Sequence, residues 1–225
     1  QKQMIYNLIK RFFDMVFSFV VLVILTPFFA TVSLLLFFTG ENEVLYFQER
    51  IGHKNKKFNI WKFATMIKNS LSLGSGSITT VNDFRVTKVG KYLRKSKINE
   101  LPQIINILKG DISIVGPRPL VENIFLFYSD EFRNKIYSVK PGLTGIGSII
   151  FRDEESIISS ITSEKPLHYY KRVISPYKGE LEMWYQSKQS FVLDSQLIFL
   201  TAWVIIFPET RIYERWFKDL PKRSF

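Results

Sequence analysis

The strongest constraint on this chain is an almost wholly apolar run at residues 15–38. Such a run is long enough to cross a bilayer, which takes about 20 residues of helix. Pro27 lies in its middle, directly after Thr26. A proline inside a helix removes one backbone hydrogen bond and bends or ends the helix. The remaining chain must therefore fold beside a membrane segment that is interrupted near its centre.

The charges on both sides of this run predict how it sits in a membrane. Lys10 and Arg11 precede it, and the chain after it is also basic. Basic flanks stay on the cytoplasmic side, so the central break favours a re-entrant helix hairpin that enters and leaves by one leaflet. Thr26 is expected to bond a backbone carbonyl freed at the bend. The alternative is an ordinary kinked span.

Two smaller expectations concern the same region. Arg11 and Asp14 are spaced to form an ion pair across one helical turn. No small-residue cleavage site follows the apolar run, so its pattern is not that of a cleavable signal peptide.

Composition narrows the class of partner. The 225 residues suit one domain with appendages, and the absence of cysteine excludes a disulfide framework. The net charge of +11 fits nucleic acid, anionic lipid or a nucleotide. Because the apolar run points to a membrane, we expect anionic lipid and a nucleotide as partners and no nucleic acid.

Residues 84–120 carry the densest chemical signal. A cluster of cations comes first: Arg85, Lys88, Lys91, Arg94, Lys95 and Lys97. A compact helix is predicted next, with Asn99 as its N-cap, Pro102 in its first turn and Gly110 just past its end. Apolar residues recur between these positions with helical spacing.

A short strand is predicted at residues 111–115, and Arg118 then stands between Pro117 and Pro119. A helix N-terminus surrounded by cations is an anion site, and Glu100 in the first turn can hold a metal against a phosphate. The stretch therefore predicts a diphosphate pocket.

These residues resemble the signature of the bacterial sugar transferases, specifically the small monotopic phosphoglycosyl transferases. In that family an arginine precedes Asp-Glu-Leu-Pro-Gln, followed by Asn-x-Leu-Lys-Gly-Asp-x-Ser-x-Val-Gly-Pro-Arg-Pro. This chain carries Arg94, then Asn-Glu-Leu-Pro-Gln at residues 99–103 and the second motif at residues 106–119. It departs from the signature at Asn99, where the family has its nucleophilic aspartate.

The resemblance implies a reaction in which a UDP-sugar gives its phosphosugar to a polyprenyl phosphate and UMP is released. It implies Mg²⁺ as cofactor, with Glu100 as its ligand, and the cytoplasmic face of a bacterial inner membrane as location. The candidate catalytic residues are Asn99, Glu100, Arg94 and Arg118; the candidate substrate-binding residues are Arg85, Arg118, Arg152 and Lys62.

Arg152 is chosen because it follows residues 141–145, which resemble the family's Pro-Gly-x-Thr-Gly turn. The alternative role for Arg152 is a surface ion pair with its acidic neighbours Asp153, Glu154 and Glu155.

The expected fold is α+β and mostly helical. We expect a re-entrant membrane hairpin at residues 1–40, a catalytic domain at 41–207 and an interfacial amphipathic tail at 208–225. Strands are expected near residues 44–47 and 58–63, and helices near 121–136, 169–185 and 190–207. Residues 73–77 are expected to be a connector, with a lid as the alternative. A homo-oligomer is left open.

Asn99 leaves the mechanism open. An amide caps a helix as well as a carboxylate does, but it lacks the anionic oxygen of a useful nucleophile. Another carboxylate, Glu100 or Asp111, is one alternative nucleophile, and direct attack by the lipid phosphate is another route. A third alternative is a catalytically impaired, membrane-anchored protein that binds a UDP-sugar or anionic lipid without turnover.

Overall fold

The structure, a computed structural model, describes residues 2–73, 79, 82–223 and 225. Within these residues the fold is mostly helical, with two small two-stranded sheets, so the predicted α+β class is confirmed. Residues 74–77, most of the segment predicted to be a connector or lid, lie outside the described residues.

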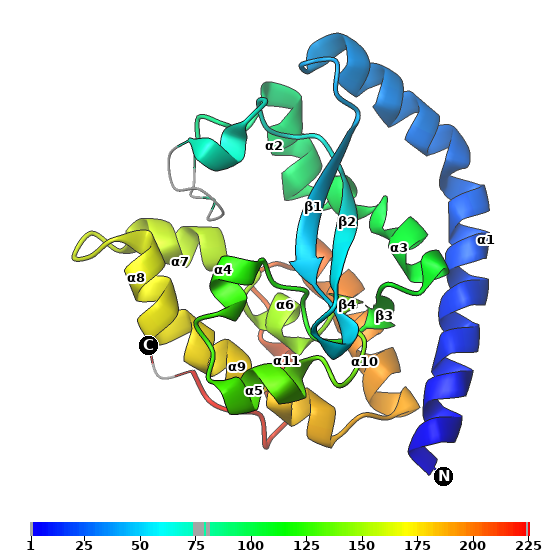
Figure 1. Cartoon of the computed structure of the whole chain (residues 1–225), viewed down its shortest axis with the longest axis vertical. Helices are drawn as coiled ribbons and strands as arrows, with labels where there is room; N and C mark the ends of the chain where they lie inside the picture. Colours follow the sequence, from blue (N-terminus) through cyan, green and yellow to red (C-terminus); the bar gives the residue numbers. More distant parts are fainter. Residues whose placement is uncertain (1, 74–78, 80–81, 224) are drawn as a thin grey trace.

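The apolar run belongs to one long helix, α1 (Lys2–Thr39), which contains Pro27. Figure 1 shows α1 curving along one side of the domain from the N-terminus to the opposite end. The hydroxyl of Thr26 donates to the carbonyl of Leu22 at 2.8 Å, one residue before Val23, whose carbonyl loses its partner at Pro27. By length and composition, α1 is sufficient to cross a membrane. Its re-entrant path stays a prediction.

Both halves of α1 contact the same domain. In the first half, Arg11 donates to the Ile107 and Leu108 carbonyls at 2.5 and 2.8 Å. The carboxylate of Asp14 accepts bonds from β3. The predicted ion pair between Arg11 and Asp14 is therefore wrong, because each side chain binds a different element of the domain instead.

In the second half of α1, Val32 and Leu36 are buried against Phe63 and Leu93. Most other large side chains of the helix are apolar and exposed, including Phe12, Phe13, Phe17, Phe19, Ile24, Leu34 and Phe38. The helix thus lies against the domain along one face and presents an apolar surface on the other.

The first sheet is an antiparallel hairpin of β1 (Leu45–Ile51) and β2 (Lys57–Phe63), joined through η1 (His53–Asn55). Leu45 pairs with Phe63, and the pairing continues without a bulge to Ile51 opposite Lys57. Strands were predicted at both places and are confirmed, although β1 extends further than expected.

A short turn, η2 (Ser70–Ser72), follows the hairpin. The motif region then forms α2 (Lys88–Lys95), η3 (Ile98–Glu100), α3 (Gln103–Lys109) and β3 (Ser113–Val115). Gly110 ends α3 with φ of 91°, as the predicted C-terminal glycine should. The predicted N-cap at Asn99 is wrong. Backbone bonds from Leu101 to Ile98 and from Ile104 to Leu101 have 3₁₀ spacing, so Asn99 lies inside a separate turn that precedes α3.

The remaining chain packs into the main core. Its elements are α4 (Glu122–Phe125), α5 (Asp130–Ile136), β4 (Gly142–Thr144), α6 (Ile146–Ile150), α7 (Glu154–Ser160), α8 (Pro166–Tyr169), the π-helical η4 (Tyr170–Ile174), α9 (Ser175–Ser187), α10 (Phe191–Ile206) and α11 (Ile212–Trp216).

The single helix expected over residues 121–136 is wrong, because it divides into α4 and α5, and the Ser129 hydroxyl caps α5 by accepting from the Phe132 N–H. The helix expected near residues 190–207 is confirmed as α10. In the C-terminal tail, Phe217 and Leu220 are buried in the main core.

The parallel pair β3 and β4 brings the backbones of Gly116 and Gly142 into close approach. Ser113 lies opposite Gly142, and the Gly142 N–H donates to the Pro117 carbonyl at 2.8 Å. A Cβ added to Gly142 would lie 2.1 Å from the backbone nitrogen of Gly116. No side chain larger than hydrogen fits at this crossing without moving backbone.

We therefore predict that Gly142→Ala destabilises the protein by about 3 kcal/mol, because the added methyl group overpacks a backbone crossing. Gly179→Ala is the matched control, since its new Cβ would meet ring atoms of Phe132 at 3.1 Å, which can shift. Thermal unfolding in detergent measures both. A Tm lowered equally in the two variants would contradict the close-approach argument.

Candidate functional site

The site is centred on Glu100, the last residue of η3. Its Oε1 accepts a bond from the Lys62 ammonium at 3.3 Å and from the Arg118 guanidinium at 3.0 Å. Lys62 comes from β2, and Arg118 comes from the loop after β3. The Glu100 side chain is only 14% exposed. The fold thus brings together three predicted site residues from three separate segments.

Backbone and side-chain bonds hold the Arg118 loop in place. The Tyr137 hydroxyl donates to the Arg118 carbonyl at 2.8 Å, and Arg50 donates to the Pro119 carbonyl at 3.1 Å. The Ile51 N–H donates to the Leu120 carbonyl at 2.8 Å. The arginine predicted to stand between two rigid residues is therefore also held in place by β1 and by Tyr137.

A narrow pocket lies beside this ion-pair cluster, lined by Arg50, Ile60, Lys62, Gln103, Arg118, Pro119 and Gly142. The sequence-based set of site residues missed Arg50. Its Nε is buried and has no hydrogen-bond partner among the residues that the structure describes. No local sequence signal marks Arg50, because its place in the pocket depends on residues 118–120 lying across β1.

The charges in the site favour an anion. Burial raises the pKa of Glu100, but Arg118, Lys62 and Lys97 outweigh it and hold that pKa well below its usual range. Burial, together with the Arg50 and Arg118 charges, lowers the pKa of Lys62 to about 7. Burial lowers the pKa of Arg50 to about 10. Two arginines and a lysine that is charged at or below neutral pH therefore face one carboxylate.

Asn99 lies next to Glu100 and is 6% exposed. Its Oδ1 is buried and accepts no hydrogen bond from the described part of the chain. A buried acceptor without a partner costs about 1–3 kcal/mol, so this amide is not placed for stability. It marks the site at the position where the resemblance puts a nucleophile.

Arg94 and Arg152 lie outside the Glu100 cluster. Arg94 donates to Glu155 at 2.7 Å, and its side chain is partly exposed. Arg152 is partly buried, and burial lowers its pKa. Its acidic neighbours pair with other cations: Asp153 with Arg223, Glu154 with Lys178 and Glu155 with Arg94. The alternative role of Arg152, an ion pair with these neighbours, is not found among the described residues.

Arg85 lies apart from the pocket, in the interior. Its side chain is 1% exposed and binds both carboxylate oxygens of Asp83, at 2.9 and 2.6 Å. It also donates to the Ser70 and Leu73 carbonyls at 2.9 Å. This environment is that of a structural arginine, and it argues against the predicted contact between Arg85 and substrate.

Asp111, considered above as another nucleophile, lies at the far end of α3 from Glu100. It accepts a bond from the Asn106 amide at 2.9 Å and lies 3.6 Å from the Lys109 ammonium. Asn106 in turn binds the β2 backbone through Trp61 and Asn59. Asp111 therefore helps to attach α3 to β2, and no contact within the described residues joins it to the pocket.

Comparison with known proteins places this site in a family. The model of the bacterial sugar transferase family matches residues 5–208. The uncharacterized sugar transferase EpsL of Bacillus subtilis is 36% identical over 166 residues, covering 74% of this chain and 71% of the relative. The UDP-glucose:undecaprenyl-phosphate glucose-1-phosphate transferase of Escherichia coli is 32% identical over 205 residues. This alignment covers 87% of this chain and 40% of the relative.

A third relative, the undecaprenyl-phosphate galactose phosphotransferase of Salmonella typhimurium, is 30% identical over 215 residues. The alignment covers 88% of this chain and 40% of the relative. This chain thus spans about two fifths of the length of the Escherichia coli and Salmonella typhimurium relatives. Because the family match extends over most of its length, the chain belongs to the bacterial sugar transferase family.

The lowered pKa of Lys62 predicts how anion binding depends on pH. Below about pH 7 the ammonium is charged and attracts an anion, and above it the group loses its proton. The affinity for UDP should therefore fall as pH rises from about 6.5 to 8.5, with proton uptake on binding near neutrality. Isothermal titration calorimetry in buffers of different ionisation enthalpy measures both.

Lys62→Arg is the control, since a guanidinium stays charged over this range. Its UDP affinity should lose that pH dependence, apart from the titration of UDP itself. The same fall in affinity in wild type and Lys62→Arg would contradict the role assigned to Lys62.

Proposed function

We propose that this protein is a phosphoglycosyl transferase that moves a phosphosugar from a UDP-sugar to a polyprenyl phosphate and releases UMP. The observation that carries the proposal is the surplus of partly buried cations around Glu100, formed by Arg50, Lys62 and Arg118. A diphosphate supplies the negative charge that this pocket lacks. The family membership and the apolar helix α1 support a donor that is soluble and an acceptor that is a lipid.

The relatives' names support the substrate classes and leave the sugar open. The Escherichia coli protein is named for UDP-glucose and undecaprenyl phosphate, and the Salmonella typhimurium protein for galactose. We therefore propose a UDP-sugar as donor and a polyprenyl phosphate as acceptor, without choosing the sugar.

The proposed reaction balances as a phosphoryl transfer. An anionic oxygen of the lipid phosphate attacks the phosphorus atom that carries the sugar. The bond from that phosphorus to the bridging oxygen breaks, and the bridging oxygen leaves with UMP. Arg118, Lys62 and Arg50 neutralise the negative charge that gathers on the phosphate oxygens, which is the main contribution of a protein to such reactions.

Direct attack is the route that the residues support best. Asn99 lacks an anionic oxygen, and Asp111 belongs to the contact between α3 and β2. Glu100 is ionised, but its Oε1 already accepts from Lys62 and Arg118, which lowers its strength as a nucleophile. The lipid phosphate brings its own anionic nucleophile and needs no side chain to replace the missing aspartate. Attack by Glu100 is the alternative route.

Glu100 is also the proposed Mg²⁺ ligand. Both of its ion pairs use Oε1, and Oε2 accepts no hydrogen bond from the described residues, so one carboxylate oxygen is available to a metal. One carboxylate with phosphate oxygens and water suits Mg²⁺, whose proposed contribution is neutralisation of phosphate charge. The nearby cations would repel a metal on its own, so the diphosphate and Mg²⁺ are expected to bind together.

For the membrane, we propose a monotopic arrangement with the domain on the cytoplasmic face, where UDP-sugars are made. Arg11 and Asp14 near one end of α1, and Val32 and Leu36 near the other, all contact one domain. Attachment of both ends of the helix to one domain supports a path that enters and leaves the membrane on the same side. The exposed apolar face of α1, with exposed Phe199 and Ile206 of α10, is proposed to enter one leaflet.

Asn99 favours a second candidate function. A chain that keeps the cationic pocket but lacks the family's nucleophile can bind a UDP-sugar or anionic lipid without turnover. UMP release separates this binding protein from the proposed enzyme, because only the enzyme cleaves the diphosphate.

We predict that the wild-type protein with Mg²⁺ and a panel of UDP-sugars releases UMP only after polyprenyl phosphate is added. Asn99→Asp restores an anionic oxygen in a buried position, so it should release UMP from the donor before any lipid is present. Glu100→Gln should lower turnover at least 100-fold, because it removes the counter-charge and the metal ligand.

Quench-flow measurement of UMP distinguishes these outcomes. A burst of UMP from wild type without lipid that persists in Glu100→Gln would contradict direct attack and any role for Glu100 as nucleophile. Absence of turnover with every donor, accompanied by UDP binding, would favour the binding protein.

The monotopic arrangement predicts that both ends of α1 face the same side. The chain has no cysteine, so Lys2→Cys and Asn42→Cys each introduce a single thiol. In inverted vesicles, a membrane-impermeant maleimide should label both thiols, and in intact cells it should label neither. Labelling of the two positions from opposite sides would establish a true span.

A further inference from the structure

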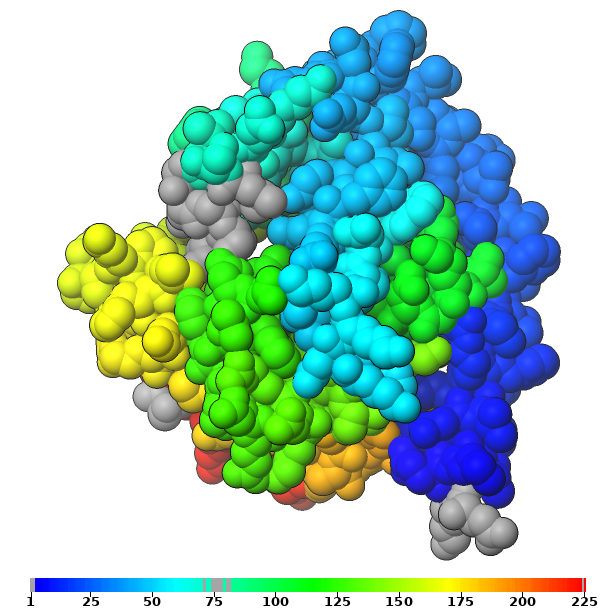
Figure 2. Space-filling view, in the orientation of Figure 1, coloured from blue at the N-terminus to red at the C-terminus, as the bar shows by residue number. Residues whose placement is uncertain are grey.

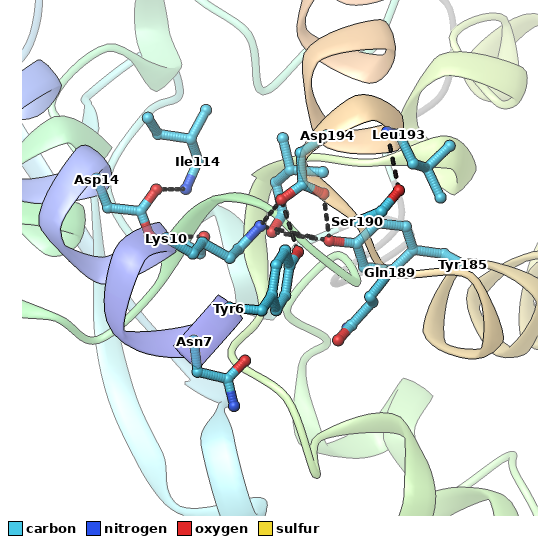
Figure 3. Close-up of polar contacts among 12 residues, drawn as sticks. Tyr6, Asn7, Lys10, Asp14, Ile114, Tyr185, Gln189, Ser190, Leu193 and Asp194 are labelled. Atoms are coloured by element: carbon cyan, nitrogen blue, oxygen red, sulfur yellow. Dashed lines mark hydrogen bonds and ion pairs between the residues drawn. The ribbon is translucent and has the colours of Figure 1, made fainter. Parts of the chain in front are cut away.

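Polar side chains join the first half of α1 to the domain, and those of Arg11 and Asp14 reach segments that carry the pocket. Arg11 binds the C-terminal carbonyls of α3, the helix that follows Glu100. Asp14 binds β3, the strand that leads to Arg118. Lys10 instead pairs with Asp194 of α10. Figure 3 shows Lys10 and Asp14 on one helix, pointing toward different partners.

Asp14 is the most restricted of these side chains. It is 4% exposed, and each carboxylate oxygen has its own partner. The Ser113 hydroxyl donates to Oδ2 at 2.7 Å, and the Ile114 N–H donates to Oδ1 at 3.1 Å. A carboxylate is costly to bury unless it is fully hydrogen-bonded. The two bonds to β3 therefore offset the cost of burying Asp14 beside the apolar run.

The contact with Asp14 acts on a short strand. β3 has three residues, and Arg118 follows its last residue, Val115, by three positions. Ser113 also lies opposite Gly142, which lines the pocket. The position of β3 against α1 therefore affects the positions of both the Arg118 loop and Gly142.

The Lys10 contact differs from that of Asp14 because its partner, Asp194, belongs to α10 and not to β3. Asp194 accepts from Lys10 and, at 2.8 Å, from the Tyr6 hydroxyl. α10 carries no residue of the pocket lining. Asp194 also accepts from the Tyr185 hydroxyl, which lies 3.4 Å from the Val115 carbonyl of β3. Tyr6→Phe removes one bond to Asp194 and leaves this contact and both bonds from Asp14 to β3 in place, so it is the control for Asp14.

We propose that Asp14 is a positioning residue: by bonding Ser113 and Ile114 it sets the place of β3, and thereby holds Arg118 in the pocket. The membrane helix is then part of the framework of the site as well as its membrane attachment. The inference concerns the site of the proposed function, but it does not depend on turnover.

The test is hydrogen–deuterium exchange of the full chain in lipid nanodiscs, read at the amides of Gly116, Arg118 and Leu120. These amides do not bond Asp14 themselves, so a change in them reports displacement of the loop. Asp14→Ala should speed their exchange about tenfold, the effect of losing one or two hydrogen bonds, and should weaken UDP binding. Tyr6→Phe should leave both at wild-type values.

Asp14→Asn should recover most of the wild-type protection, because its amide oxygen can accept from Ile114 and its amide nitrogen can donate to the Ser113 hydroxyl. If Asp14→Ala does not accumulate as folded protein, Ser113→Ala replaces it and should raise exchange at the same three amides.

Exchange that stays at the wild-type rate in Asp14→Ala or its replacement overturns the proposal. An equal increase in Tyr6→Phe overturns it too, because attachment of α1 in general would then be responsible. If UDP does not bind the wild-type protein, the proposed donor is wrong, and the exchange comparison still decides the role of Asp14.

Discussion

The pair of contacts from Lys62 and Arg118 to the Glu100 carboxylate is the interaction on which the rest of the site depends. Each cation is partly or wholly removed from water, and a buried charge without a partner is costly. Glu100 supplies that partner to both, from a turn that joins α2 to α3. With Arg50 added, the cations still outnumber the carboxylate. The same contacts therefore stabilise the fold and leave a site for an anion.

The second constraint is the attachment of α1 at both ends. Polar side chains hold its first half, and apolar packing holds its second half. The difference follows from the sequence, since the helix begins with a polar and basic segment and continues as an almost wholly apolar run. In the proposed arrangement, the soluble donor and the lipid acceptor meet because the pocket and the membrane helix belong to one framework.

The sequence predicted those parts of the structure that follow from local chemistry. Gly110 was predicted to end a helix and does so, because a left-handed residue there favours glycine. The strands of the hairpin and the long helix α10 were predicted from apolar patterns. The separate turn around Asn99 was not, because Asn99 and Pro102 together also match the start of an ordinary helix.

The site was predicted in part, for a similar reason. Glu100 and Arg118 lie in a motif, so their sequence spacing marks them. Arg50 joins them only through folding of residues 118–120 across β1, and no local pattern encodes that contact. Arg85 shows the opposite case: it lies among the motif's cations, yet Asp83 and two backbone carbonyls surround it in the interior. Charge alone did not separate a structural arginine from one in the pocket.

Because Asn99 lacks an anionic oxygen, the pocket can bind a diphosphate whether or not the protein cleaves it, and binding alone tests the pocket most directly. Equilibrium dialysis of UDP and of uridine against the wild-type protein in lipid nanodiscs, with Mg²⁺ and at pH 6.5, measures what the phosphates contribute. The surplus of cations predicts that UDP binds at least about 100-fold more tightly than uridine, since bonds between ionised groups are the strong ones. Equal affinity for UDP and uridine would contradict the account of this pocket as a diphosphate site.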